Sequence, residues 1–234
     1  MDLDAELGTP VDWEGARAPG DDVLAGERVR LEPLHEVRHL DDLWAAAHEG
    51  DPRLWDYLPF GPFADRDDFG RWLHAGAHAH ETTDQRFYAI VDAATGRAAG
   101  MIAYLRIAPA LGRIEIGNIW FGAALQRTPA ATEAIFLAAS HAFDDLGMRR
   151  LEWKCNALNA RSRRAAARFG FTYEGTFRQD QVVKGRNRDT AWFSILDGEW
   201  PAVRDGFAAW LAPENFDAEG RQRRGLAELR GTAG

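Results

Sequence analysis

The segment from Leu125 to Ala134 constrains the fold of this chain most strongly, because a strand-like run turns directly into a helix there. The strand-like run spans 113–121, and an apolar-periodic run continues to about Leu146. Thr128 is a favourable N-cap residue, and Pro129 suits the first helical position, where its missing N–H is not needed. A helix start that follows a strand presents free backbone N–H groups, which attract a phosphate or pyrophosphate. The junction therefore predicts a site for an anionic cofactor, although a capped helix start without a ligand shows the same local pattern.

The order of elements along the chain predicts a mixed α/β structure. An antiparallel first half is joined to a strand–helix–strand second half, which indicates one layered domain over 27–212. Residues 1–26 are rich in Asp, Glu, Gly, Pro and Ala and predict an N-terminal arm, and 213–234 predict a charged C-terminal tail with a short helix near 225–230. Hydrophobic periodicity predicts strands at 27–33, 86–91, 98–107, 113–121, 150–155, 171–183 and 189–196, and helices at 34–49, 65–80, 129–146, 159–169 and 200–211.

Charge and cysteine content exclude several classes of protein. The formal net charge of -8 argues against general nucleic-acid binding, which relies on a basic surface, and is compatible with a cationic amine substrate. The single cysteine, Cys155, excludes an intrachain disulfide, and its apolar strand predicts a buried structural thiol. We find no basic-plus-apolar leader and no run of membrane-spanning length, so we expect no membrane partner and a cytoplasmic location.

The histidines raise the question of a metal. His35 and His39 are spaced for one helix face, as are His74 and His78, with His80 nearby. No carboxylate or cysteine pattern accompanies these pairs along the sequence. The pattern therefore favours exposed helix histidines, and we expect no metal.

Further motifs follow the helix start in a recognisable order. A strand and an Asn-x-x-Ser helix start occupy Leu151 to Ser162, and a Gly-Phe strand start lies within Arg168 to Gly175. This order resembles the GNAT superfamily of acetyl-CoA-dependent N-acetyltransferases, in particular its RimJ/RimL-type branch of ribosomal-protein N-terminal acetyltransferases. The resemblance covers roughly 28–211 and is most specific over 115–200. It implies an α/β (mixed α+β) GNAT fold, with a central, mostly antiparallel mixed sheet of about seven strands and helices on both faces.

The resemblance also implies a reaction. Members transfer acetyl from acetyl-CoA to a primary amine, here of a protein N-terminus or a small molecule, by direct attack in a ternary complex, and many form homodimers. Two departures support an alternative, a non-catalytic acyl-CoA-binding or regulatory module. Gln126-Arg127-Thr128-Pro129 stands where most relatives have Gln-Gly-x-Gly, and Ala166 stands where many have a tyrosine acid.

The cofactor residues implied by the resemblance fall into three groups. The pyrophosphate turn comprises Gln126, Arg127, Thr128, Ala130, Ala131 and Thr132. A bulge in the strand around Asn118 places Ile119, Trp120 and Phe121 beside the acetyl carbonyl, because a bulge frees backbone N–H groups. Asn159 and Ser162 would hold the pantetheine arm while also capping their helix.

The same resemblance implies catalytic and acceptor-binding residues. Glu115 is the first candidate for the base that removes a proton from the amine, and Asp180 is the second, or else binds the ammonium. The branch carries a glutamate one residue after Asp180, where this chain has Gln181. Ser162 would protonate the leaving thiolate. The aromatic residues Trp55, Tyr57 and Phe60 would form one wall of the acceptor site, with a place in the core as the alternative.

Overall fold

The computed structural model describes residues 8–230, and its centre is one eight-stranded sheet. The strand order is β1-β2-β3-β4-β5-β6-β8-β7, and among these strands only β5 and β6 pair in parallel. The mostly antiparallel sheet confirms the predicted fold, and the two-residue edge strand β1 brings the number to eight. The strands are β1 (Leu24–Ala25), β2 (Val29–Pro33), β3 (Arg86–Asp92), β4 (Ala98–Ala108), β5 (Arg113–Phe121), β6 (Arg150–Asn156), β7 (Thr172–Val183) and β8 (Arg186–Leu196).

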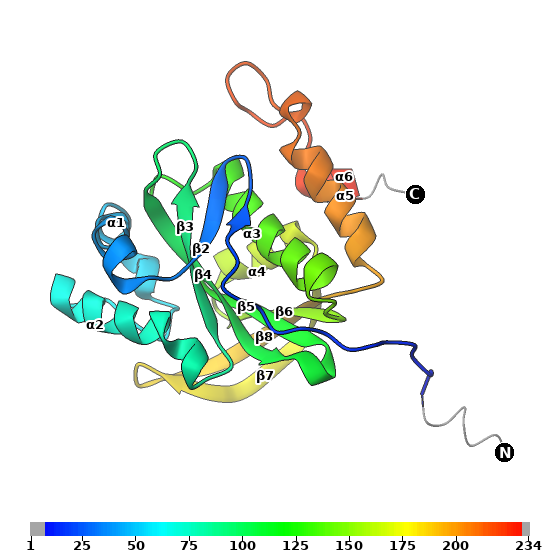
Figure 1. The fold of residues 1–234 in the computed structure, drawn as a ribbon, viewed down its shortest axis with the longest axis horizontal. Coiled ribbons are helices and arrows are strands. Elements are labelled where there is room, and N and C mark those ends of the chain that lie inside the picture. The colour runs from blue at the N-terminus through cyan, green and yellow to red at the C-terminus, as the bar shows by residue number, and fades with distance from the viewer. Residues whose placement is uncertain (1–7, 231–234) are drawn as a thin grey trace.

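Helices cover both faces of the sheet (Figure 1). One face carries α1 and α2, and the other carries α3 and α4, with α5 and α6 packed beyond them. The helices are α1 (Glu36–His48), α2 (Arg66–Ala77), α3 (Pro129–Ser140), α4 (Ala160–Phe169), α5 (Trp200–Leu211) and α6 (Leu226–Arg230). Short turns of helix are η2 (Pro52–Trp55), η3 (Ala79–Glu81), η4 (Pro109–Leu111), the π-helical η5 (His141–Asp145) and η6 (Pro213–Asn215).

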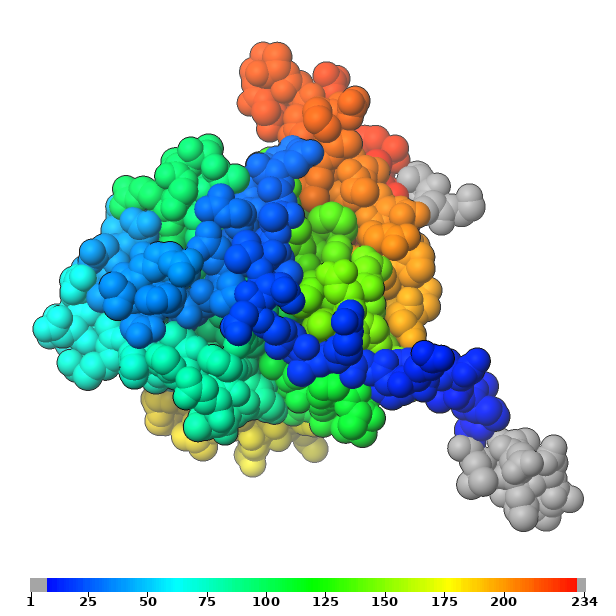
Figure 2. All heavy atoms as spheres, viewed as in Figure 1, coloured from blue at the N-terminus to red at the C-terminus, as the bar shows by residue number. Residues whose placement is uncertain are grey.

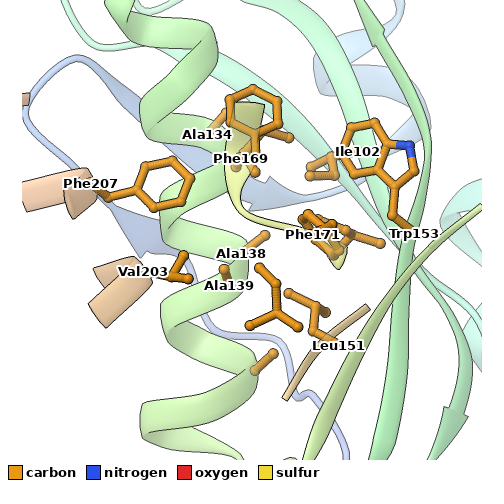
Figure 3. Packing of buried hydrophobic residues seen from close by; sticks show 14 of the residues in the cluster. Ile102, Ala134, Ala138, Ala139, Leu151, Trp153, Phe169, Phe171, Val203 and Phe207 are labelled. Carbon is orange, nitrogen blue, oxygen red and sulfur yellow. The ribbon is translucent and has the colours of Figure 1, made fainter. Parts of the chain in front are cut away.

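The larger core lies between the sheet and α3 (Figure 3). Ala134, Ala138 and Ala139 are buried on the face of α3 that their spacing of three and four residues defines. Small side chains at these positions let the helix lie close to Leu151 and Trp153 of β6. The start of α3 is thereby held against the sheet, at a fixed position beside β5 and β6.

Strands β5 and β6 pair only at their beginnings. The register joins Arg113 to Arg150 and ends at Ile116 and Trp153, so the rest of each strand is free of the other. Beyond this point β5 contains a bulge, because Met101 faces Trp120 while Ala103 faces Gly117. Asn118 takes a positive φ of 50° within that bulge, which is where the sequence predicted one. The two strands therefore diverge and open the sheet at its centre.

Segments near both ends of the described residues, 8–230, contribute to the packed structure. Within the predicted arm, the Arg17 backbone N–H donates to the Leu146 carbonyl at 2.8 Å, and β1 joins the edge of the sheet. Figure 2 shows this segment in blue, crossing the surface beside α3. The predicted short helix in the tail is confirmed as α6, whose Leu226 is 1% exposed. The boundaries at 26 and 213 stay predictions, and residues 1–7 and 231–234 lie outside the described part. Within residues 8–230, no helix has the length and apolar character that crossing a bilayer requires.

Candidate active site

A cleft of about 1330 Å³ runs through the opening between β5 and β6. Trp153 and Cys155 line it from the side of the sheet that carries α3, whereas Glu115 and Lys154 line it from the opposite side. Side chains alternate between the two faces of a strand, so a cleft that reaches both sets passes through the sheet. Two molecules can therefore approach one point from opposite faces.

One end of the cleft, which we call the cofactor end, lies at the starts of α3 and α4. Thr128 caps α3 as predicted, and its Oγ1 accepts a hydrogen bond from the Ala131 N–H at 3.3 Å. Arg127 takes a φ of 63°, the left-handed conformation that glycine adopts most easily. The turn therefore has a glycine-type backbone and places a guanidinium beside the start of α3.

All but one of the predicted cofactor residues line this cleft. The exception is Ala130, whose side chain packs against the core. Only its backbone N–H is available to contact a cofactor. The sequence analysis missed Arg161, Arg164 and Arg168, which also line the cofactor end. The missed signal was the repeat of arginines along the helix after Asn159. The lining residues that were predicted are Ile119, Trp120, Phe121, Gln126, Arg127, Thr128, Ala131, Thr132, Asn159 and Ser162.

Ser162 lies where the helix α4 begins. Its backbone N–H donates to the Asn159 side-chain oxygen at 3.0 Å, so Asn159 acts as the helix cap. The Ser162 Oγ accepts a hydrogen bond from the Trp153 indole N–H at 3.0 Å, which leaves its own hydroxyl proton free to be donated. Burial raises the pKa of the neighbouring Cys155 thiol, while a contact with Ser162 opposes that rise. Cys155 is thus the buried thiol that the sequence predicted, and Ser162 places a hydroxyl group in this part of the cleft.

At the opposite end, which we call the acceptor end, Glu115 belongs to a cluster of buried charges. It is 4% exposed, and its Oε2 lies 2.7 Å from the Lys154 Nζ. The Arg106 Nε lies 3.8 Å from the Glu115 Oε2 and 3.6 Å from the Glu152 Oε2. Burial raises the pKa of Glu115, and the ion pair with Lys154 opposes that rise. A carboxylate with a raised pKa is a stronger base than a carboxylate with the ordinary pKa, so it is better suited to accept a proton.

The structure places the second candidate base, Asp180, outside the cleft. Asp180 is exposed on β7 and does not line the cleft, whereas its neighbour Gln181 does. Successive residues of a strand point to opposite faces, so only one of the two can reach the cleft. Across from Gln181 on β8 lies Arg188, a cleft residue whose Nε is buried without a hydrogen-bond partner in the described structure. The polar groups on this side of the cleft are therefore the Gln181 amide and the Arg188 guanidinium.

The aromatic loop after α1 also differs from its prediction. Trp55 is 3% exposed and packs against Trp120 with ring centroids 5.7 Å apart, so it belongs to the core beneath the cleft. Phe60 packs on Trp72 at 4.5 Å and does not line the cleft either. Tyr57 does line it, as predicted. For Trp55 and Phe60 the packing agrees with the alternative that the sequence left open, a place in the core.

Two long-range hydrogen bonds hold this loop in place over the acceptor end. The Tyr57 hydroxyl donates to the Leu158 carbonyl at 3.3 Å, and the Lys184 Nζ donates to the Trp55 carbonyl at 2.7 Å. The first bond joins the loop to the start of α4, and the second joins it to the turn between β7 and β8. Together they fix the position of the loop, whose Tyr57 lines the cleft.

No histidine lines the cleft. His35 caps α1 by accepting the backbone N–H groups of Val37 and Arg38. His39 is 3% exposed and contacts Glu32, so the prediction of an exposed histidine was wrong at this position. Burial lowers the pKa of His39, because the charged form is the one that loses its hydration.

Comparison with known proteins agrees with this architecture. The family model "Acetyltransferase (GNAT) domain" matches residues 28–172. The crystal structure of a GCN5-related N-acetyltransferase from Brucella melitensis is 49% identical, with a TM-score of 0.91 over 94% of this chain and 99% of that chain. A probable GNAT-family acetyltransferase from Chromobacterium violaceum ATCC 12472 is 44% identical, with a TM-score of 0.77 over 83% of this chain and 96% of that chain.

A curated relative is also similar. It is "Putative ribosomal N-acetyltransferase YdaF" from Bacillus subtilis (strain 168), which is 29% identical over 105 residues. The matched region spans 45% of this chain and 57% of that protein.

Proposed function

This chain belongs to the GNAT acetyltransferase family, and on that premise we propose that it transfers acetyl from acetyl-CoA to a primary amine by direct attack in a ternary complex. The observation that carries the proposal is the cleft that passes through the sheet between β5 and β6. Its cofactor end has the groups that an anionic cofactor needs, and its acceptor end has a buried carboxylate. Both substrates can therefore be bound at once.

The residues of the cofactor end fit acetyl-CoA. Four arginines line this end in a chain whose formal net charge is -8, and the start of α3 adds oriented backbone N–H groups. Arg127 and Arg168 are placed on either side of the α3 start, with the Arg168 Nη1 donating to Thr132 Oγ1 at 3.1 Å. Acetyl-CoA supplies the acetyl group as a thioester. The chain binds the phosphates and orients the carbonyl at the bulge around Asn118.

Two proton transfers complete the reaction. Glu115 accepts, directly or through one water molecule, the proton that the amine loses as its nitrogen attacks the acetyl carbon. Lys154 and Arg106 hold the Glu115 carboxylate in place. Ser162 donates its hydroxyl proton to the sulfur that leaves. The two groups approach from opposite faces of the sheet, so removal and delivery of protons do not compete.

The acceptor remains a choice between a peptide N-terminus and a small amine. The name of the Bacillus relative favours a protein N-terminus. The cytoplasmic location and the homodimer expected from the sequence likewise stay predictions.

Release of free thiol from acetyl-CoA, measured across a panel of small amines and short peptides, tests this function. Amine-dependent release, with the acetylated product identified by mass spectrometry, is the expected result. Binding of acetyl-CoA without any amine-dependent thiol would instead support the alternative, a non-catalytic acyl-CoA-binding module. That alternative draws on the replaced glycines at Arg127 and Pro129.

A further inference from the structure

A histidine pair outside the cleft gains a carboxylate partner through the fold. His74 and His78 lie one turn apart at the end of α2, and Glu36 lies in the first turn of α1. The two helices lie side by side on one face of the sheet (Figure 1), and they run in opposite directions. The beginning of α1 therefore meets the end of α2, although Glu36 and His74 are far apart in the sequence.

The three side chains converge on one point. The Glu36 Oε1 lies 3.7 Å from the His74 Nδ1 and 3.7 Å from the His78 Nε2. One ligand atom from each of the three residues lies within 4.8 Å of the other two. Ligand atoms about 2.0–2.1 Å from a tetrahedral Zn²⁺ are about 3.4 Å from one another. Only small side-chain movements are needed to bring these atoms onto one ion.

A fourth residue orients one of the ligands. The His78 Nδ1 lies 2.9 Å from the Glu81 Oε1, so this carboxylate engages the ring nitrogen that faces away from Glu36. A metal-binding histidine usually donates its second ring N–H to a carboxylate or a carbonyl in this manner, which fixes the tautomer. The His78 Nε2 is then left with its lone pair toward Glu36 and His74.

We propose that Glu36, His74 and His78 form a binding site for Zn²⁺, with water completing the tetrahedral coordination. Two imidazoles and one carboxylate are ligands that suit Zn²⁺ and not Mg²⁺, which prefers oxygen ligands. The side chains of His74 and His78 are 63% and 44% exposed, so an ion can reach them from solvent. None of the three residues lines the cleft, so the ion joins α1 to α2 and takes no part in acetyl transfer.

Isothermal titration of the full chain, without any affinity tag, with ZnCl₂ tests this site. We expect one saturable site that MgCl₂ does not occupy. A ligand that binds only the folded protein at 100 times its dissociation constant should raise Tm by about 5–10 °C for a chain of this size. The absence of saturable Zn²⁺ binding would overturn the proposal, whatever the outcome of the acetyl-transfer assay.

Variants locate the site. His74→Ala and Glu36→Gln should each weaken Zn²⁺ binding roughly 10- to 100-fold or more, and Glu81→Gln should weaken it by roughly 10-fold. The matched control is His80→Ala, because His80 is exposed just beyond α2 and contacts the Ala77 carbonyl instead of Glu36. His80→Ala should bind Zn²⁺ as the unaltered chain does. Equal loss in His80→Ala and His74→Ala would show that Zn²⁺ binds elsewhere, and the proposal would fail.

Discussion

At the cofactor end of the cleft the polar groups come from the first turns of two helices, whereas at the acceptor end they come from side chains of several strands. Thr128 and Asn159 each cap a helix through a residue three positions later. Glu115, in contrast, is held by Lys154 of β6 and Arg106 of β4. A site made from helix starts depends on local backbone geometry, and a buried charge cluster depends on every strand that contributes to it. The acceptor end should therefore be more sensitive to single substitutions than the cofactor end.

Trp55→Ala should have the largest effect and tests whether the acceptor end rests on the core. Loss of a buried tryptophan leaves a cavity next to Trp120 and should lower the free energy of unfolding by about 3–5 kcal/mol. Unfolding in denaturant measures this change in the free energy of unfolding. Tyr57→Phe is the matched control, since it removes only the bond to Leu158 and should change the free energy by about 1 kcal/mol or less. A Trp55→Ala protein of normal stability with a raised Michaelis constant for the amine would return Trp55 to the acceptor wall.

Glu115→Gln tests whether the acceptor end supplies the base while the cofactor end alone binds acetyl-CoA. The substitution keeps the shape but removes the proton acceptor, so the turnover rate should fall by roughly 10²-fold or more at neutral pH. The dissociation constant for acetyl-CoA, measured by titration, should not change, because the cofactor end is separate. Asp180→Asn is the control and should retain full activity. Full activity in Glu115→Gln would move proton removal to a water chain.

Arg127→Glu tests the cofactor end. Reversal of a charge beside the phosphates should raise the dissociation constant for acetyl-CoA by roughly 10-fold, since repulsion from the new carboxylate adds to the loss of an attraction worth up to about 1 kcal/mol. Arg127→Gly separates charge from backbone, because glycine adopts the φ of 63° without strain. It should weaken binding less than Arg127→Glu, by roughly 3-fold, and leave turnover unchanged. An affinity that neither substitution alters would show that the phosphates bind away from this turn.

Lys154→Met tests the buried ion pair through its effect on pH dependence. Burial raises the pKa of Glu115 and Lys154 opposes it, so removal of the lysine should raise that pKa further. The base is active only when deprotonated, and the acid limb of kcat/KM should therefore move to higher pH.

The same pKa shift determines how the stability of the protein changes with pH. An acid whose pKa is raised by folding stabilises the protein below its unfolded-state pKa, and this contribution is lost as pH rises through the folded-state pKa. Unfolding measured at a series of pH values should show that Lys154→Met loses more of its free energy of unfolding with rising pH than the unaltered chain does. An acid limb that stays in place would indicate that Glu115 is not the titrating base.

The sequence by itself determined the order of the elements and the two capped helix starts beside the cleft. Hydrophobic periodicity located the helices and the main strands, and the short helix near 225–230 is present as α6. Thr128, Pro129 and Asn159 predicted two capped helix starts, because capping depends on residues only a few positions apart. The bulge at Asn118 followed from the family resemblance and is present at that position.

Only the tertiary structure decided which charged and aromatic side chains meet. Lys154 and Arg106 reach Glu115 across three strands, and Glu36 reaches His74 from another helix. The choice of Gln181 over Asp180, and the burial of Trp55, depended on which face of a strand or loop turned toward the cleft. A shift of one residue in strand register turns every side chain to the other face. The local sequence does not contain that register, because it is set by the pairing of strands that are distant along the chain.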